Sequence, residues 1–392
     1  MGSWWGMGAA RKALMGAAVA VISVDLTAAG LLVARRVNSR PAPAVTASAE
    51  TGAASGATAA PAPAPPGKAA AVAAPPPPEP LPSQPVTALA GCPPPPPPPH
   101  PPTPPPWRPS VLVPDAALPP VPAPPAEVSG DLRALAGKGM WIWKLPATEG
   151  GDPAAIVRRA KGAGLHQLWV RVGDSRYGFY ARPDLETLVP AAHRAGLAVL
   201  GWGFPFLWDP VADAGWSRAA LDWRSSGGQA LDGFSADIEG ADEGVVLRER
   251  RATLYLGLVR PGLGDRPLVA TVFRPNDHRW ATYPYAGMAP YVDAFAPMVY
   301  WGCLEPGAAT TQAVTRLATL RPVHPIGQAY NMASEDGRPA SPSPAETNRF
   351  LDVSLRSGAL GASFWDWQEM SGDEWAALTA FQWRIAAGRR LS

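Results

Sequence analysis

The sequence has little cysteine, little histidine and no concentration of positive charge. Its two cysteines, Cys92 and Cys303, are too few for a disulfide framework and belong to no CxxC or Cys/His ligand spacing, although the two could pair. The net charge is +2, with 34 basic against 32 acidic residues, and no run of Lys or Arg marks a phosphate-binding face. We therefore expect no nucleic-acid partner and no cofactor.

Proline is abundant but unevenly placed. Most of the 50 prolines lie between residues 41 and 125, so only the chain after about residue 130 is expected to fold. Residues 35–130 are typical of a disordered Ala/Pro-rich linker, in which residues 93–106 would form an extended polyproline II rod of about 40 Å. A spacer is the favoured interpretation, and a docking site for a proline-binding module is the alternative.

A long apolar run precedes this linker. Residues 13–34 are flanked on both sides by pairs of basic residues and are long enough to cross a hydrocarbon core of roughly 30 Å. Asp25 near the middle costs about 2.5–3.5 kcal/mol on insertion scales, which the surrounding aliphatic residues can offset. We predict a single-pass anchor in the cell membrane, with residues 1–12 as cytoplasmic or n-region sequence and the folded domain outside the cytoplasm. A cleaved signal peptide is the alternative.

The remaining chain alternates β-rich runs with helix-like segments. Eight such runs occur, at residues 140–143, 167–172, 198–204, 233–239, 268–273, 294–300, 326–330 and 362–367. Helix signals separate them: Asp-Pro starts at 152–153 and 209–210, a Ser-Pro-Ala-Glu capping box at 343–346, and glycine stops at 164 and 196. Eight strand-helix units of this length predict an α/β fold, a (β/α)8 TIM barrel over residues 137–390.

Catalytic groups of such barrels come from the carboxyl ends of the strands, and these positions are polar and aromatic here. The 16 tryptophans include several at strand ends, where an indole can stack on a sugar ring while polar neighbours bind hydroxyls. The histidines fall mainly at helix or strand starts, which disfavours a metal-dependent hydrolase, and we expect no metal. The pattern favours a polysaccharide substrate, and core packing of the tryptophans is the alternative.

The stretch 232–240 concentrates acidic residues on one strand. Because alternate residues of a strand face opposite sides, Ser235, Asp237 and Glu239 share one face, and Phe234, Ala236 and Ile238 would pack outward. Burying an unpaired carboxylate costs several kcal/mol or forces its pKa to shift. The pair is either an acid catalyst with a neighbour that tunes it, or a salt-bridged or helix-capping pair.

Three short stretches at the predicted strands, 232–239, 298–300 and 361–365, resemble the motifs of a known enzyme family. The stretch 232–239 resembles the fourth-strand Asp-x-x-Asp-x-Asp-x-Glu signature of family-18 glycoside hydrolases, the chitinase-like TIM barrels, with three of its four acids present. The run 298–300 is similar to the family's sixth-strand Met-x-Tyr element, and 361–365 to its eighth-strand run ending in Trp. The sequence departs from the pattern at Ser235, which replaces an acid, and at Trp301, which follows the tyrosine. The Asp-x-Glu strand and Trp367-Gln368 also resemble, more distantly, the family-25 lysozyme-type muramidases.

The resemblance implies a glycoside hydrolase in which Glu239 protonates the glycosidic oxygen. Asp237 and Tyr300 would orient the sugar's acetamido group, whose oxygen attacks the anomeric carbon, and a substrate without that group needs a second carboxylate from Asp174, Asp366 or Glu369. The expected substrate-binding residues are Trp143, Arg171, Trp202, Asp232, Arg274, Gln328 and Trp365. An inactive carbohydrate-binding barrel of the cell envelope is the alternative, favoured by the loss of the acid at Ser235.

Overall fold

The computed structural model describes residues 112–128, 130–332 and 338–384 of the 392-residue chain. The predicted membrane anchor and most of the predicted linker lie outside the described residues. Within the part of the chain that is described, none of the helices combines the length and the apolar character that a membrane span requires.

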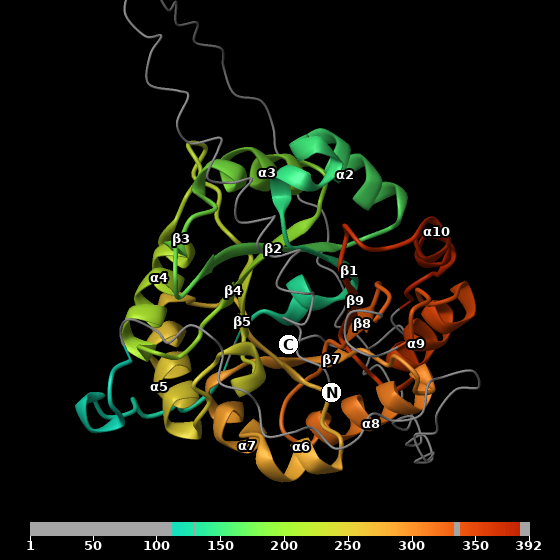
Figure 1. The fold of residues 1–392 in the computed structure, drawn as a ribbon. Helices are drawn as coiled ribbons and strands as arrows, with labels where there is room; N and C mark the ends of the chain where they lie inside the picture. Colours follow the sequence, from blue (N-terminus) through green and yellow to red (C-terminus); the bar gives the residue numbers. More distant parts are fainter. Residues whose placement is uncertain (1–111, 129, 333–337, 385–392) are drawn as a thin grey trace, which may run out of the picture. The chain divides into compact units, whose positions relative to one another are not determined.

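The described domain is a closed ring of eight parallel strands, as the sequence pattern predicts (Figure 1). Each strand pairs with the next around the ring, and β1 closes it by pairing with both β2 and β9. A short hairpin strand, β3, adds an antiparallel pair to the end of β2. The strands are β1 (Gly137–Ile142), β2 (Gln167–Asp174), β3 (Gly178–Phe179), β4 (Ala198–Phe204), β5 (Gly233–Asp237), β6 (Leu268–Phe273), β7 (Ala294–Val299), β8 (Ile326–Gln328) and β9 (Gly361–Trp365).

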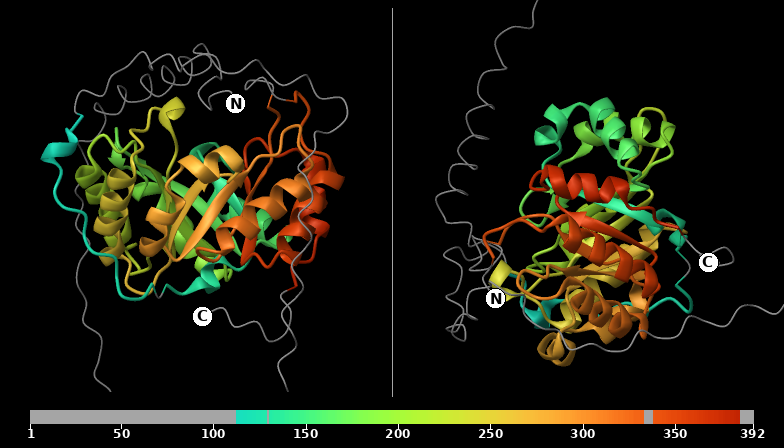
Figure 2. Two further views of the ribbon diagram at one scale, coloured as in Figure 1. Left: turned by 90° about the horizontal axis from the view of Figure 1, so that it is seen from below. Right: turned by 90° about the vertical axis from the view of Figure 1, so that its right-hand side faces the viewer.

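Helices surround the strands, and the views in Figures 1 and 2 place them on the outside of the ring. The α-helices are α2 (Pro153–Gly162), α3 (Arg182–Arg194), α4 (Pro210–Asp222), α5 (Glu249–Val259), α6 (Asp277–Thr282), α7 (Tyr285–Met288), α8 (Pro306–Ala318), α9 (Pro344–Arg356) and α10 (Gly372–Ala380). Short 3-10 turns are η1 (Asp115–Ala117), η2 (Leu132–Leu135), η3 (Leu145–Ala147), η4 (Glu149–Gly151), η5 (Ala241–Glu243), η6 (Arg260–Gly262) and η7 (Ala289–Tyr291).

The predicted helix ends are confirmed by their caps. Asp152 and Asp209 each accept a backbone N–H in the first turn of α2 and α4, and Ser343 forms the capping box with Glu346 at the start of α9. Gly164 and Gly196 take φ values of +67° and +70° just after α2 and α3, where a side chain would be strained. These short signals therefore set where each helix starts and stops.

The barrel interior is filled by tryptophan. Trp141 stacks on Trp169 with ring centroids 4.8 Å apart and planes 9° apart, and Trp202 packs against Trp141 at 5.6 Å. A Cβ at Gly139 would lie 2.9 Å from Nε1 of Trp169, so glycine is needed there for the indole to fit. The alternative assigned to the tryptophans, core packing, thus holds for these three, which are all buried.

The last part of the predicted linker packs on the barrel. Arg251 of α5 is buried, with its side chain 3% exposed, and it donates to Oδ1 of Asp115 at 2.6 Å and to the carbonyl of Val113. Tyr291 also donates to the carbonyl of Pro122 at 2.9 Å. A buried guanidinium must be paired, so this segment supplies partners that the barrel itself does not.

Candidate active site

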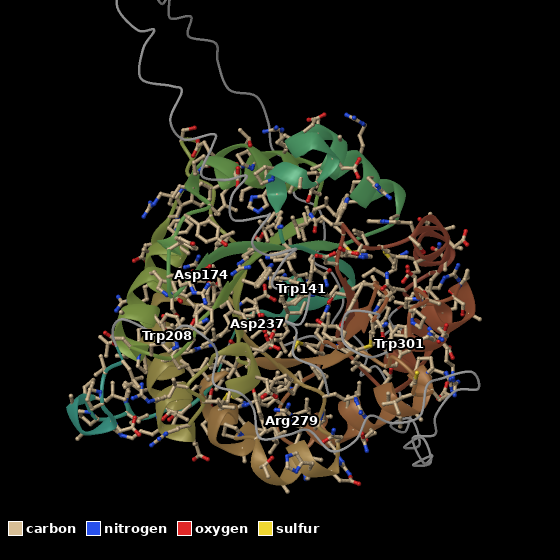
Figure 3. All side chains as sticks on the ribbon, viewed as in Figure 1. Trp141, Asp174, Trp208, Asp237, Arg279 and Trp301 are labelled. Carbon is tan, nitrogen blue, oxygen red and sulfur yellow. The ribbon has the colours of Figure 1, made fainter. Side chains whose placement is uncertain are left out.

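A pocket opens at the carboxyl ends of the strands, where the fold places catalytic groups. The empty space between its walls, counted together with the open solvent at its mouth, is about 210 Å³. Figure 3 shows Asp237 and Trp141 inside the ring of helices. The residues that line it come from six different strands or the positions just after them: Trp141, Asp237, Glu239, Thr271, Met298, Tyr300, Ile326 and Trp365.

The two carboxyls at the end of β5, Asp237 on the strand and Glu239 just after it, form the polar part of this pocket. Asp237 and Glu239 are 6% and 3% exposed and face inward, whereas Phe234, Ala236 and Ile238 pack in the layer between strands and helices, as alternation predicts. Burial raises the pKa of Asp237 to about 7, and the guanidinium of Arg171 opposes that rise. Oδ1 of Asp237 has no hydrogen-bond partner among the described residues, so this oxygen is available to a ligand.

The sequence departs from the family pattern at Ser235, one turn of the strand pleat below these acids. Its hydroxyl lies 2.8 Å from that of Thr271 on β6, and both side chains are buried. A neutral hydroxyl pair therefore stands where the family has a third carboxylate on this face. The charge in the pocket comes from Asp237 and Glu239 instead.

Tyr300 and Trp365 form the aromatic wall of the pocket. Burial raises the pKa of the Tyr300 phenol well above its usual value, and carboxylates including Asp237 and Glu239 raise it further, so the hydroxyl is a neutral donor. Trp365 packs edge-on against Trp202 at 5.2 Å and lies 6.4 Å from Trp143. The side chains of Tyr300 and Trp365 therefore line the same pocket as the carboxyls of Asp237 and Glu239.

The second departure, Trp301, does not reach this pocket. It is 1% exposed and packs on Phe350 of α9 with ring centroids 5.5 Å apart, in the layer between strands and helices. Figure 3 places it toward the helices rather than at the centre. Because Tyr300 faces inward, the next residue faces outward, so this substitution leaves the pocket wall unchanged.

Arg171 and Trp202 support the pocket from β2 and β4. Arg171 donates to Oδ2 of Asp174 at 3.0 Å and lies over the Trp202 ring at 5.3 Å, close enough to Asp237 to lower that pKa. Trp202 is buried, and its Nε1 donates to the carbonyl of Ile142 at 3.3 Å. Neither side chain belongs to the pocket lining itself, and of the seven predicted substrate-binding residues only Trp365 does.

Three predicted substrate-binding residues lie elsewhere. Asp232 sits at the amino end of β5, where Oδ2 pairs with His193 at 2.8 Å and accepts the N–H of Val199. Arg274 turns outward and donates to Gln312 of α8 at 2.8 Å. Gln328 accepts the N–H of Gly302 at 2.7 Å and donates to the carbonyl of Tyr330, so it holds two loops. The structure does not bring these side chains to the pocket lining.

Among the three candidates for a second carboxylate, Asp366 stands out. Asp174 is engaged by Arg171 and by the backbone N–H groups of Arg176 and Tyr177. Asp366 follows Trp365 directly, is 1% exposed, and accepts the N–H of Glu369 at 3.0 Å through Oδ1. Its Oδ2 finds no hydrogen-bond partner in the described chain, and burial raises its pKa to about 7.

Several lining residues were missed by the sequence reasoning. Trp141, Thr271, Met298 and Ile326 lie two or three positions before the residues that were selected on the same strands, yet they line the pocket. The signal was present in the alternation of each strand, because Trp141 shares a face with Trp143, and Thr271 with Phe273. Strand-end position alone overlooks the lower wall of the pocket.

No group of three or more His, Cys, Asp or Glu side chains in the described ranges is arranged to hold a metal ion. Cys303, in the loop after β7, is disulfide-bonded. The sequence contains one other cysteine, Cys92, which lies outside the described residues.

Comparisons with known proteins give structural likeness only. No protein-family model and no curated protein sequence matches the chain. Among solved structures, the spore cortex-lytic enzyme SleL of Bacillus cereus is 11% identical, with a TM-score of 0.48 over 63% of this chain and 75% of that one. A chitinase from Chromobacterium violaceum is 9% identical, with a TM-score of 0.48 over 63% and 100%. A family GH18 chitinase from Cycas revoluta is 10% identical, with a TM-score of 0.46 over 62% and 98%. Identities of this size show a shared fold and do not identify a reaction.

Proposed function

We propose that this protein is a glycoside hydrolase that cleaves an envelope or N-acetylated polysaccharide, with Glu239 as the general acid. The observation that carries the proposal is the burial of Asp237 and Glu239 together in an aromatic-lined pocket at the catalytic end of the barrel. Two carboxyls on one face of a strand, shielded from water, retain a proton between them near neutral pH. A shared proton of this kind is what a general acid requires.

The chemistry follows from where the groups lie. Glu239 would give its proton to the glycosidic oxygen as the bond to the leaving sugar breaks. Asp237, through its available oxygen, and the neutral hydroxyl of Tyr300 would hold the acetamido group whose oxygen attacks the anomeric carbon. If the sugar lacks that group, Asp366 has the buried, available oxygen that a second carboxylate needs.

A catalytically inactive carbohydrate-binding barrel is the second candidate. The neutral Ser235–Thr271 pair favours it, because a third carboxylate of the family pattern is missing. Such a protein would keep the indole of Trp365 as a sugar-binding surface while failing to turn the sugar over.

We further propose that the barrel acts outside the cytoplasm, tethered to the cell membrane by residues 13–34 and spaced from it by the proline-rich linker. The apolar length of that segment and the proline content of residues 35–111 support this location. Protease added to intact cells should release the barrel from a tethered protein, and a barrel that stays protected would contradict this orientation.

The test of the activity uses the full-length chain, its Glu239→Gln variant and an Asp352→Asn control on the surface of α9. Reducing ends released from chitin oligosaccharides and from peptidoglycan would be measured together with binding of the same sugars. Hydrolysis by wild type and control but not by Glu239→Gln supports the acid assignment. Binding by all three without hydrolysis supports the inactive barrel, and undiminished turnover by Glu239→Gln removes Glu239 as the acid.

A further inference from the structure

Two guanidinium groups lie on either side of β5 in the ring, Arg171 on β2 and Arg279 on α6 after β6, and within the described chain Arg279 has no acidic partner. Arg279 of α6 lies over the ring of Phe273 at 3.7 Å from the centroid, and its Nη1 is 3.6 Å from the position of a Cβ on Gly240, the residue after Glu239. Across the described residues, its side chain makes no hydrogen bond or ion pair. Figure 3 shows it on the α6 side of the molecule.

The second group, Arg171, approaches the pair from β2. Its Nη2 is bonded to Asp174, but its Nε is buried and meets no hydrogen-bond acceptor in the described part of the chain. A buried donor without an acceptor costs about 1–3 kcal/mol, so such an atom near the pocket residue Asp237 points to an acceptor that arrives with a ligand.

Arg171 opposes the task of the carboxyl beside it. A general acid must keep its proton, and a nearby positive charge favours its loss, as Arg171 does for Asp237. Phe273 holds the Arg279 guanidinium in place beside Gly240 by a cation–π contact, which fixes a charge without neutralising it. The arrangement is explained when a negative charge on the substrate completes it.

We propose that the substrate of this barrel is an acidic glycan, whose carboxylate is bound by Arg279 with Arg171 on the opposite side of the carboxyl pair. Guanidinium groups bind carboxylates through paired, charge-assisted hydrogen bonds. The inference rests on the proposed function, and it adds the charge of the substrate. It also makes Arg279 a residue that determines specificity rather than one that takes part in bond cleavage.

The experiment compares two glycans that differ only in charge. Peptide-free muramyl glycan strands, which carry free lactyl carboxylates, would be compared with the same strands after their carboxylates are reduced to alcohols. Binding and hydrolysis by the full-length protein would be measured separately, for wild type, Arg279→Gln and a control, Arg356→Gln, which removes a surface arginine paired with Asp352 on α9.

Wild type is expected to bind the acidic strands on the order of tenfold more tightly than the reduced strands. A Kd ratio of this size corresponds to the free energy of about one charge-assisted hydrogen bond. Arg279→Gln should lose that preference while binding the reduced strands as wild type does, and Arg356→Gln should keep it. Equal binding of the two glycans by wild type, or an unchanged preference in Arg279→Gln, overturns the inference whether or not hydrolysis occurs. Charge-dependent binding without any hydrolysis supports the inference and refutes the proposed activity, so the two failures are distinguishable.

Discussion

We predict that the pH dependence of kcat/KM shifts in opposite directions when Asp237 and Arg171 are each replaced. Asp237 and Glu239 are two residues apart on one strand face, so at about 3.3 Å per residue their backbones are roughly 6.6 Å apart. With an effective dielectric constant of about 20, two charges at that distance repel by about 2.5 kcal/mol, which corresponds to roughly 2 pKa units. Loss of the last proton from the pair is therefore delayed to higher pH by the presence of both charges.

In Asp237→Asn that repulsion is gone, so the alkaline limb of kcat/KM should move to lower pH by up to about 2 units. In Arg171→Gln the cation that lowers the pKa of Asp237 is gone, so the limb should move to higher pH. The assay is the pH profile of reducing-end release at substrate concentrations below KM, with Asp352→Asn as the control that leaves the limb in place. General damage to the fold would not move the limb in opposite directions. A limb that stays fixed in Asp237→Asn, or moves the same way in both variants, refutes the reasoning.

Three further predictions concern the buried acid Asp366, the pocket residue Trp365 and the helix cap Ser343. Burial raises the pKa of Asp366 from 3.8 to about 7, so the folded protein holds a proton that the unfolded chain loses, and stability falls as the pH rises through that range. Asp366→Asn should therefore gain up to about 4 kcal/mol over wild type in urea unfolding at pH 8 and little at pH 4, and an equal difference at both pH values would contradict this. Trp365→Ala should weaken binding of sugar by on the order of 1 kcal/mol or more in calorimetry with the fold intact by circular dichroism, whereas unchanged affinity would place the sugar elsewhere. Ser343→Ala removes the capping box of α9 and should cost about 1 kcal/mol of unfolding free energy, and a cost near zero would show that packing alone holds the helix end.

The barrel was predictable because its signals are local. A run such as 198–204 specifies its own strand, and the cap at Ser343 specifies the start of α9 without reference to the rest of the chain. The inward face of β5 followed from alternation alone. The site was less predictable, since a residue at a strand end can face either side. On β6, Val269 and Thr271 face inward, so the alternation of side chains predicts that Arg274 faces outward. On β5, Asp232 precedes the strand and therefore lies at its amino end, away from the pocket.

Other features of the site depend on contacts that no short stretch contains. Arg279 approaches Gly240 across 39 positions of sequence, which depends on how the loop after β6 folds back. Asp366 became the best second carboxylate because the structure shows that Asp174 is already engaged. Partners of this kind are chosen by tertiary packing, so the sequence could supply the candidates but not rank them.

Two acids at the amino ends of the strands are more fully paired than Asp237 and Asp366 at the carboxyl ends, and that difference is a physical argument for where function lies. At the amino ends, Asp232 bonds to His193 and the N–H of Val199, while Asp293 accepts the N–H groups of Gly130 and Leu268 and pairs with Arg260. Those acids hold the strands in register and leave little for a ligand to do. At the carboxyl ends, Asp237 and Asp366 are as deeply buried, yet each keeps an oxygen without a hydrogen-bond partner among the described residues. Asp237 lines the pocket, so the cost accepted at its unpaired oxygen indicates a group that is completed by a substrate.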